Sequence, residues 1–189
     1  MAKVTPILEA QAAWARPARV ATLSRAGLTR LRFYGLMGLI QHFGKTFLMP
    51  AIWLKPISID LLTRNHVDTA PASLGMEFLE VGDDFIRGRV PVDRRTRQPY
   101  GILHGGVSVV LAETLGSCGA AYACPTEYRA VGLDINANHL KATSQGWVTG
   151  IARPVHRGRS THVWQIDMHN DHGDLTCVSR ITMAILAPT

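Results

Sequence analysis

The sequence predicts an α+β domain in which an antiparallel sheet wraps around one long central helix. Residues 106–123 contain no proline, many small side chains and a single charge, a pattern typical of a buried helix. Strand-like apolar runs occur on both sides of this segment, at 74–81, 85–92, 130–142, 147–155, 161–169 and 175–186. Because a long apolar helix has to bury its surface against these strands, a helix-on-sheet layout follows.

Local signals mark the ends of the other elements. Ser58 stands where it can cap a short helix over 59–64. Gly82-Asp83-Asp84 separates the first two apolar runs and indicates a hairpin, and a polar loop follows over 93–100. Turn residues separate the last four strands, namely Gly146, Gly158 and the run 171–174.

The charge of the chain is concentrated at its beginning. The net charge is +6 over 189 residues, and residues 1–50 hold seven of the 20 basic residues but only one of the 14 acidic ones. The remainder is neutral overall, which argues against a nucleic-acid-binding surface. We therefore expect a basic N-terminal extension over 1–50 and one domain over 51–189.

Three interpretations of the extension stay open. It is a poorly packed arm, or the product of a start codon upstream of the natural one. It is an amphipathic segment in contact with a membrane surface, since Arg stands beside Leu, Phe and Tyr. Or it is a transit peptide, on its Arg-rich composition. Its apolar stretch 33–40 is too short to span a bilayer.

The cysteine pattern indicates a reducing compartment, with the cytoplasm as the expectation. Cys118, Cys124 and Cys177 are odd in number and lack the spacing of a metal site. Neither a disulfide framework nor a bound metal is expected.

Glu113 is the residue whose presence needs a chemical explanation. It is the one charged side chain in 105–123, and at helical spacing it shares a face with small residues such as Gly116 and Ser117. A lone carboxylate on a core helix is costly unless it is paired or neutralised. This favours a functional carboxylate with room for a ligand beside it. An ion pair with an Arg at a subunit interface is the alternative.

The tripeptide His104-Gly105-Gly106 leaves the first N–H groups of the helix accessible. These groups and the helix dipole favour negative charge, such as that developing on the oxygen of an attacked carbonyl. Alternatively, the glycines only let the loop turn into the helix, and His104 packs or caps.

The distance between these two features has a consequence for assembly. Eight residues separate Gly105 from Glu113, roughly 12 Å along a helix axis. The two groups cannot both contact one carbonyl group. If both act, the carbonyl lies between the helix start of one subunit and the carboxylate of another, which predicts at least a two-fold dimer.

A polar cluster at 153–161 (RPVHRGRST) combines three arginines with two hydroxyl groups around a turn. Together these side chains suit the phosphates of a CoA-like ligand. A solvated hairpin is the alternative for any single Arg. The candidate contacts are Arg157, Arg159, Ser160 and Thr161, and the set could be extended by His139 and Lys141.

Several segments in order resemble the hotdog-fold acyl-CoA thioesterases of the phenylacetic-acid-degradation type. Within these, the chain is similar to the 1,4-dihydroxy-2-naphthoyl-CoA hydrolases and the Arthrobacter-type 4-hydroxybenzoyl-CoA thioesterases. The resemblance covers about 52–186, whereas residues 1–50 have no counterpart. The matching segments are 98–106 (QPYGILHGG), 108–113 (SVVLAE), Gly116-Ser117, 131–139 (VGLDINANH) and 163–166 (VWQI).

The resemblance implies hydrolysis of acyl-CoA, with aromatic acyl groups favoured. Glu113 would be the nucleophile or the general base, and the Gly105 N–H would polarise the thioester carbonyl. Gln98 and His104 would hold the thioester end, and Ser117 would assist the hydrolytic step. The resemblance further implies a homotetramer built as a dimer of dimers, without metal or redox cofactor.

Two observations qualify this expectation. Ser160 and Thr161 fall where one branch of the family contacts the CoA side of the ligand, but Arg159-Ser160-Thr161 differs from the naphthoate branch, so the acyl group stays open. A non-catalytic hotdog domain that binds or senses acyl-CoA is the competing function. That function predicts loss of Glu113 or of the Gly-Gly entry, and both are present.

Overall fold

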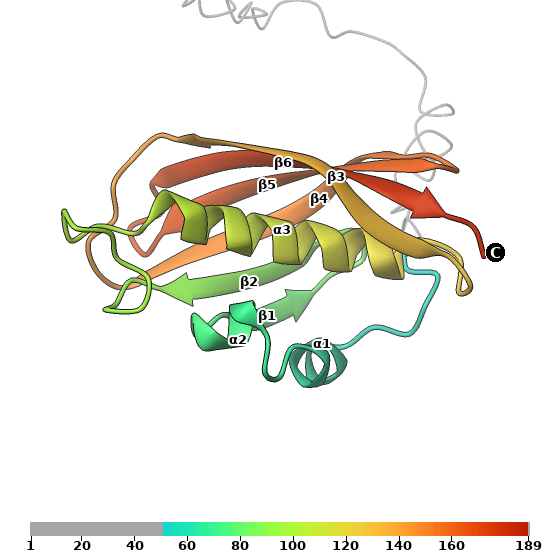
Figure 1. Cartoon of the computed structure of the whole chain (residues 1–189), viewed down its shortest axis with the longest axis horizontal. Coiled ribbons are helices and arrows are strands. Elements are labelled where there is room, and N and C mark those ends of the chain that lie inside the picture. Colours follow the sequence, from blue (N-terminus) through green and yellow to red (C-terminus); the bar gives the residue numbers. More distant parts are fainter. Residues whose placement is uncertain (1–50, 189) are drawn as a thin grey trace, which may run out of the picture. The chain divides into compact units, whose positions relative to one another are not determined.

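The computed structural model describes residues 51–188, which form one six-stranded antiparallel sheet with a long helix on its face (Figure 1). The strand order is β1-β2-β4-β5-β6-β3, so β1 and β3 are the two edges. The predicted α+β class and hotdog arrangement are confirmed. The strands are β1 (Glu77–Val81), β2 (Ile86–Pro91), β3 (Arg129–His139), β4 (Trp147–Arg157), β5 (Thr161–Asn170) and β6 (Leu175–Leu186).

The long helix α3 (Gly105–Tyr122) packs against β2, β3, β4, β5 and β6. Glycines allow its close approach to the sheet. Leu115, which is fully buried, lies over Gly88 and Gly150, two glycines that are paired across β2 and β4. On the helix itself, a Cβ at Gly119 would lie 2.6 Å from the ring of Trp164. Larger side chains at these positions would push the helix away from the sheet.

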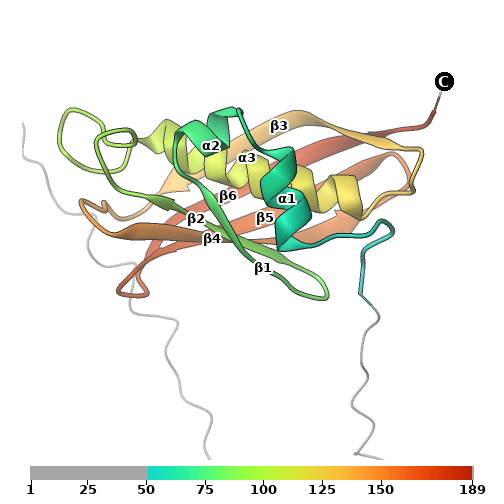
Figure 2. The ribbon, with the colours of Figure 1, turned by 90° about the horizontal axis from the view of Figure 1, so that it is seen from below.

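Two short helices, α1 (Ile59–Asn65) and α2 (Ala70–Ser73), precede the sheet and lie beside β1 and α3 (Figure 2). The predicted cap of α1 is confirmed, since the Ser58 hydroxyl accepts a hydrogen bond from the Leu61 N–H at 3.2 Å. Leu62 anchors α1 in the core.

The first strand is shorter than predicted. Apolar character begins at Leu74, but that residue caps α2, and Gly75 then reverses the chain with φ +73°. The strand therefore starts only at Glu77. The helix α2 was not predicted, because four residues of mixed character carry no periodic signal.

The three cysteines are buried and free. Burial raises the pKa of the Cys118 thiol to about 12 and also raises the pKa of Cys177. Between residues 51 and 188, no helix is long and apolar enough to cross a membrane. The interpretations of residues 1–50 fall outside the described residues.

We expect Gly119→Ala to lower the free energy of unfolding by about 1–3 kcal/mol, because the added methyl group overpacks the contact with Trp164. Alanine is the better helix former, so propensity alone predicts the opposite sign. Urea unfolding at fixed protein concentration measures the difference. Thr63→Ala at an exposed position of α1 is the control and should be neutral or slightly stabilising. Stabilisation by Gly119→Ala would show that the helix can move away without loss.

Candidate active site

A cavity of about 290 Å³ at the N-terminal end of α3 gathers four of the residues singled out in the sequence. Gln98, Gly105, His139 and Lys141 all line it, although they come from a loop, a helix start and the end of β3. Two of them were expected at the thioester and two at CoA. The structure therefore brings part of each expected group to one place.

A tight turn holds the loop that carries Gln98. The Gly101 N–H donates to the Gln98 carbonyl (2.8 Å), and the Gln98 N–H donates to the Ile102 carbonyl (2.9 Å). Gly101 has φ +78°, which only glycine adopts without strain. The side-chain oxygen of Gln98 accepts from the Tyr100 N–H at 3.2 Å. Its NH₂ group is therefore the end that can donate to a ligand.

His104 is the N-cap of α3. Its Nδ1 accepts a hydrogen bond from the Gly106 N–H at 2.9 Å, so the capping interpretation of His104 is confirmed. Gly105 follows as the first helical residue, whose N–H has no carbonyl in a preceding turn to bond to. A Cβ on Gly105 would lie 2.8 Å from Nε2 of His139. The His139 ring thus packs against the helix start, and a side chain at residue 105 would displace that ring.

Glu113 is exposed to solvent in the single chain, and the expectation of a carboxylate in the core is wrong. Most of α3 is buried, but this side chain points toward the edge strand β3, where a Cβ on Gly132 would lie 3.2 Å from Oε1. The two residues share a hollow of about 380 Å³. The structure thus leaves open space beside the carboxylate, as the small neighbouring residues predicted.

Ser117 lies one helical turn beyond Glu113 and is half-buried. Its hydroxyl donates to the thioether sulfur of Met183 at 3.8 Å. A thioether is a weak acceptor, so this bond holds the hydroxyl only loosely.

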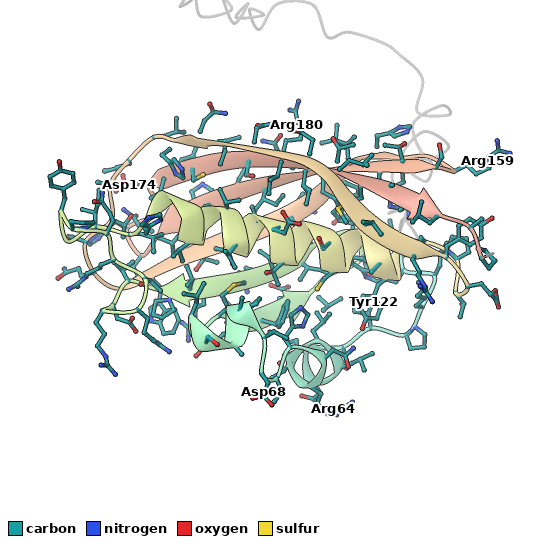
Figure 3. All side chains as sticks on the ribbon, viewed as in Figure 1. Arg64, Asp68, Tyr122, Arg159, Asp174 and Arg180 are labelled. Carbon is teal, nitrogen blue, oxygen red and sulfur yellow. The ribbon has the colours of Figure 1, made fainter. Side chains whose placement is uncertain are left out.

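The arginine cluster lies at the other end of the sheet. Thr161 pairs with Ala184, whereas His139 pairs with Cys177. Ala184 also pairs with Val131, so eight residues of β3, roughly 27 Å, separate the cluster from His139. Within one chain, His139 and Lys141 therefore do not extend the cluster, contrary to the expectation. Figure 3 shows Arg159 and Asp174, the ion-pair partner of Lys141, at opposite ends.

Only part of the arginine cluster faces a common cavity. Arg157 and Arg159 line one of about 510 Å³ beyond the C-terminal end of α3. Arg157 also donates to the Ile52 carbonyl at 2.9 Å. Arg153 is turned away, because it pairs with Asp84 and stacks on Phe85.

His162 lines the same cavity and was missed by the sequence reasoning, since a lone histidine in a strand carries no signal. It is 3% exposed. Burial and then the charge of Arg157 lower its pKa, so its neutral form is favoured.

Lys141 is held by an ion pair with Asp174 at 2.6 Å. Hydrogen bonds from Lys141 and then Asn170 lower the pKa of the Asp174 carboxyl, which keeps it ionised. A phosphate that binds Lys141 would have to compete with this carboxylate. Both side chains are partly exposed, so the competition takes place in a well-solvated setting.

Three hydroxyl residues, Ser108, Thr143 and Thr176, line the first cavity in addition to the predicted residues. Thr143 is 8% exposed, and within the part of the chain that the structure describes its hydroxyl has no hydrogen-bond partner. It lies in an irregular segment, which sequence patterns do not resolve. Residues 51–188 contain no cluster of three or more His, Cys, Asp or Glu side chains suited to a metal ion.

Known proteins are similar to this chain in both fold and sequence. Residues 100–177 match the model of the thioesterase superfamily. The 1,4-dihydroxy-2-naphthoyl-CoA hydrolase of Escherichia coli is 44% identical over 136 residues, which cover 71% of this chain and 99% of that protein. The proofreading thioesterase EntH of Cronobacter turicensis is 39% identical over 71% of this chain and 98% of its own length. The crystal structure of a Haemophilus influenzae thioesterase covers 72% of this chain and 95% of that chain, with 43% identity and a TM-score of 0.71. From its fold and this similarity, the chain belongs to the thioesterase superfamily and is a thioester hydrolase.

Proposed function

We propose that this protein hydrolyses acyl-CoA thioesters to the free acid and CoA, with Glu113 as the catalytic carboxylate. The observation that carries the proposal is the cavity at the start of α3, which brings Gln98, Gly105, His139 and Lys141 together. The Gln98 NH₂ and the Gly105 N–H suit a thioester carbonyl. His139 and Lys141 suit the polar, phosphate-bearing part of CoA.

Glu113 acts on the carbonyl carbon in one of two ways. As a general base, it takes a proton from water while the water oxygen bonds to the carbon; the C–S bond then breaks, and the leaving sulfur takes up a proton. As a nucleophile, its own oxygen bonds to the carbon and displaces CoA, and water then hydrolyses the anhydride. In both routes the Ser117 hydroxyl, one turn away, can hold the attacking water.

The helix start supplies the groups that stabilise the reacting carbonyl. Negative charge on its oxygen is stabilised by the Gly105 N–H and by the positive end of the helix dipole. Because Nδ1 of His104 accepts from Gly106, the neutral ring carries its proton on Nε2. That Nε2–H can donate to the sulfur or to the carbonyl oxygen and so assist departure of CoA.

The site we propose is shared between two subunits. Glu113 and Gly105 lie roughly 12 Å apart along α3, too far to reach one carbonyl group. The edge strand β3 offers a surface for a second copy, with Val131 48% and Leu133 64% exposed. Antiparallel pairing of two such strands would bring the helix start of one copy toward Glu113 of the other.

The same pairing would bring the two separated groups of candidate CoA-binding residues together. His139 and Lys141 stand at one end of β3, and Arg157, Arg159, Ser160 and Thr161 at the other. Two antiparallel copies place opposite ends of β3 side by side, so one CoA molecule can contact both groups. We propose a homotetramer in which two such dimers associate.

The remaining parts of the proposal concern substrate, location and the extension. We propose an aromatic acyl group, by similarity to the aryl-CoA thioesterases. The name of the E. coli relative specifies an aromatic acyl-CoA. Three buried, free thiols fit a reducing compartment and support a cytoplasmic location. We propose that residues 51–189 contain the whole catalytic apparatus and that residues 1–50 are a separate basic extension.

Glu113→Gln is expected to lower kcat by about two to four orders of magnitude without unfolding the protein, because the variant can neither accept a proton nor form the anhydride. Steady-state hydrolysis of aryl-CoA substrates measures the loss, and circular dichroism checks the fold. Glu127→Gln, at another exposed position, is the matched control. Near-normal turnover in Glu113→Gln would make Glu113 structural, and acyl-CoA binding without turnover in the wild type would favour a sensing domain.

The two roles of His104 can be separated by two substitutions. His104→Ala removes the cap and should lower the free energy of unfolding by about 0.5–2 kcal/mol, whereas His104→Asn keeps a capping oxygen and should restore stability. Both variants lack the Nε2–H and should show lower kcat. Thermal unfolding and turnover are measured side by side. If His104→Asn recovered full turnover, His104 would serve only as a cap.

Sharing of the site predicts complementation between two inactive variants. Gly105→Val places a branched side chain at the helix start, where it obstructs the entry and displaces the His139 ring, and Glu113→Gln removes the carboxylate. In a mixed dimer one site carries both defects and the other carries neither, so about half of the wild-type turnover per dimer should return. Mixed oligomers are isolated with two affinity tags, and each pure variant is the control. Mixed oligomers without activity would assign both groups to sites within one chain.

A further inference from the structure

The edge strand β3 is irregular where it passes Glu113. Its ladder with β6 shifts register between Gly132 and Asp134, so β3 carries one extra residue there. Gly132 pairs with Met183, and Ile135 pairs with Ile181. Both partners on β6 are buried, so Gly132 and Ile135 lie on the face of the sheet that meets α3.

Beside the carboxylate, the bulge widens the gap between the side chains of β3 that point toward α3. Two residues rather than one stand between the inward positions Gly132 and Ile135, and Gly132 contributes no side chain. The hollow of about 380 Å³ is lined by Glu113, by the bulge and by two isoleucines. A Cβ on Gly132 would lie 3.2 Å from Oε1 of Glu113, in the space that a group beside the carboxylate would occupy.

We propose that Gly132 and the β3 bulge determine which acyl groups reach Glu113, by admitting a flat group attached directly to the carbonyl carbon. This inference rests on the proposed function and concerns the acyl side of the same site. An aroyl thioester carries its planar ring on the carbonyl carbon and cannot rotate the ring away from the wall beside it. Bare backbone accepts the face of such a ring, whereas a flexible alkyl chain can avoid an added methyl group.

The test compares benzoyl-CoA, phenylacetyl-CoA and hexanoyl-CoA as substrates of Gly132→Ala. Benzoyl-CoA has its ring on the carbonyl carbon, and phenylacetyl-CoA interposes a methylene. The kcat/KM for benzoyl-CoA should fall about tenfold or more relative to hexanoyl-CoA, the discrimination that one methyl-sized change in a pocket provides. The decrease in kcat/KM for phenylacetyl-CoA should lie between those for benzoyl-CoA and hexanoyl-CoA. Unchanged ratios among the three substrates overturn the proposal, whether or not overall turnover falls.

Two further variants keep the test decisive. Leu133→Ala widens the same hollow and should raise kcat/KM for bulkier aroyl-CoA substrates relative to hexanoyl-CoA. The same variant tests the proposal if Gly132→Ala does not fold. Asn136→Ala, exposed on the same strand and outside the hollow, should leave all ratios unchanged. Melting temperatures are compared for all variants.

A binding experiment separates this proposal from the proposed function. In a Glu113→Gln background, calorimetry with benzoyl-CoA should show about tenfold weaker binding on adding Gly132→Ala, while binding of free CoA stays the same. If the wild-type protein did not hydrolyse benzoyl-CoA and this binding pattern still held, the catalytic function would be rejected, but Gly132 would remain the residue that selects the acyl group. Equal weakening for both ligands would reject the selector.

Discussion

The close approach of α3 to the sheet is the constraint on which the rest of the structure depends. Leu115 reaches the sheet only because Gly88 and Gly150 stand side by side on neighbouring strands. Gly119 does the same for Trp164 from the helix side. Close packing at these points fixes the height and rotation of the helix, because a packed interior has few alternative arrangements. The positions of Gly105 and Glu113 follow from that fit.

Rotation of the helix also decides which of its faces stays open. Leu115 and Gly119 face the strands in the middle of the sheet, whereas Glu113 faces β3, the last strand on its side. An edge strand has a partner on one side only, and here it is bulged as well. The carboxylate can therefore be solvated in a single chain, although the helix that carries it is largely buried.

Much of the fold could be predicted because its signals are local. The helix pattern gave 106–123 and the structure has Gly105–Tyr122, while the last strand matches its predicted bounds. The capping of α1 by Ser58 followed from one side chain and its position. The exposure of Glu113 could not be predicted, since it depends on the strand order of the sheet and on one inserted residue in β3. The separation of Lys141 from Arg159 was missed for a related reason: distance along a paired strand is invisible until the pairing is known.

Because all three thiols are buried, the folded protein should react only slowly with thiol-specific dyes. Cys118 is the extreme case, with a pKa of about 12 that leaves almost no thiolate at neutral pH. Residues 1–50 contain no cysteine, so nothing in that segment adds to the signal. A dye added to the protein with its substrate would thus count CoA molecules as they are released. Without substrate, the same dye would react only with protein molecules that have unfolded and exposed their cysteines. One reagent therefore reports both catalysis and unfolding.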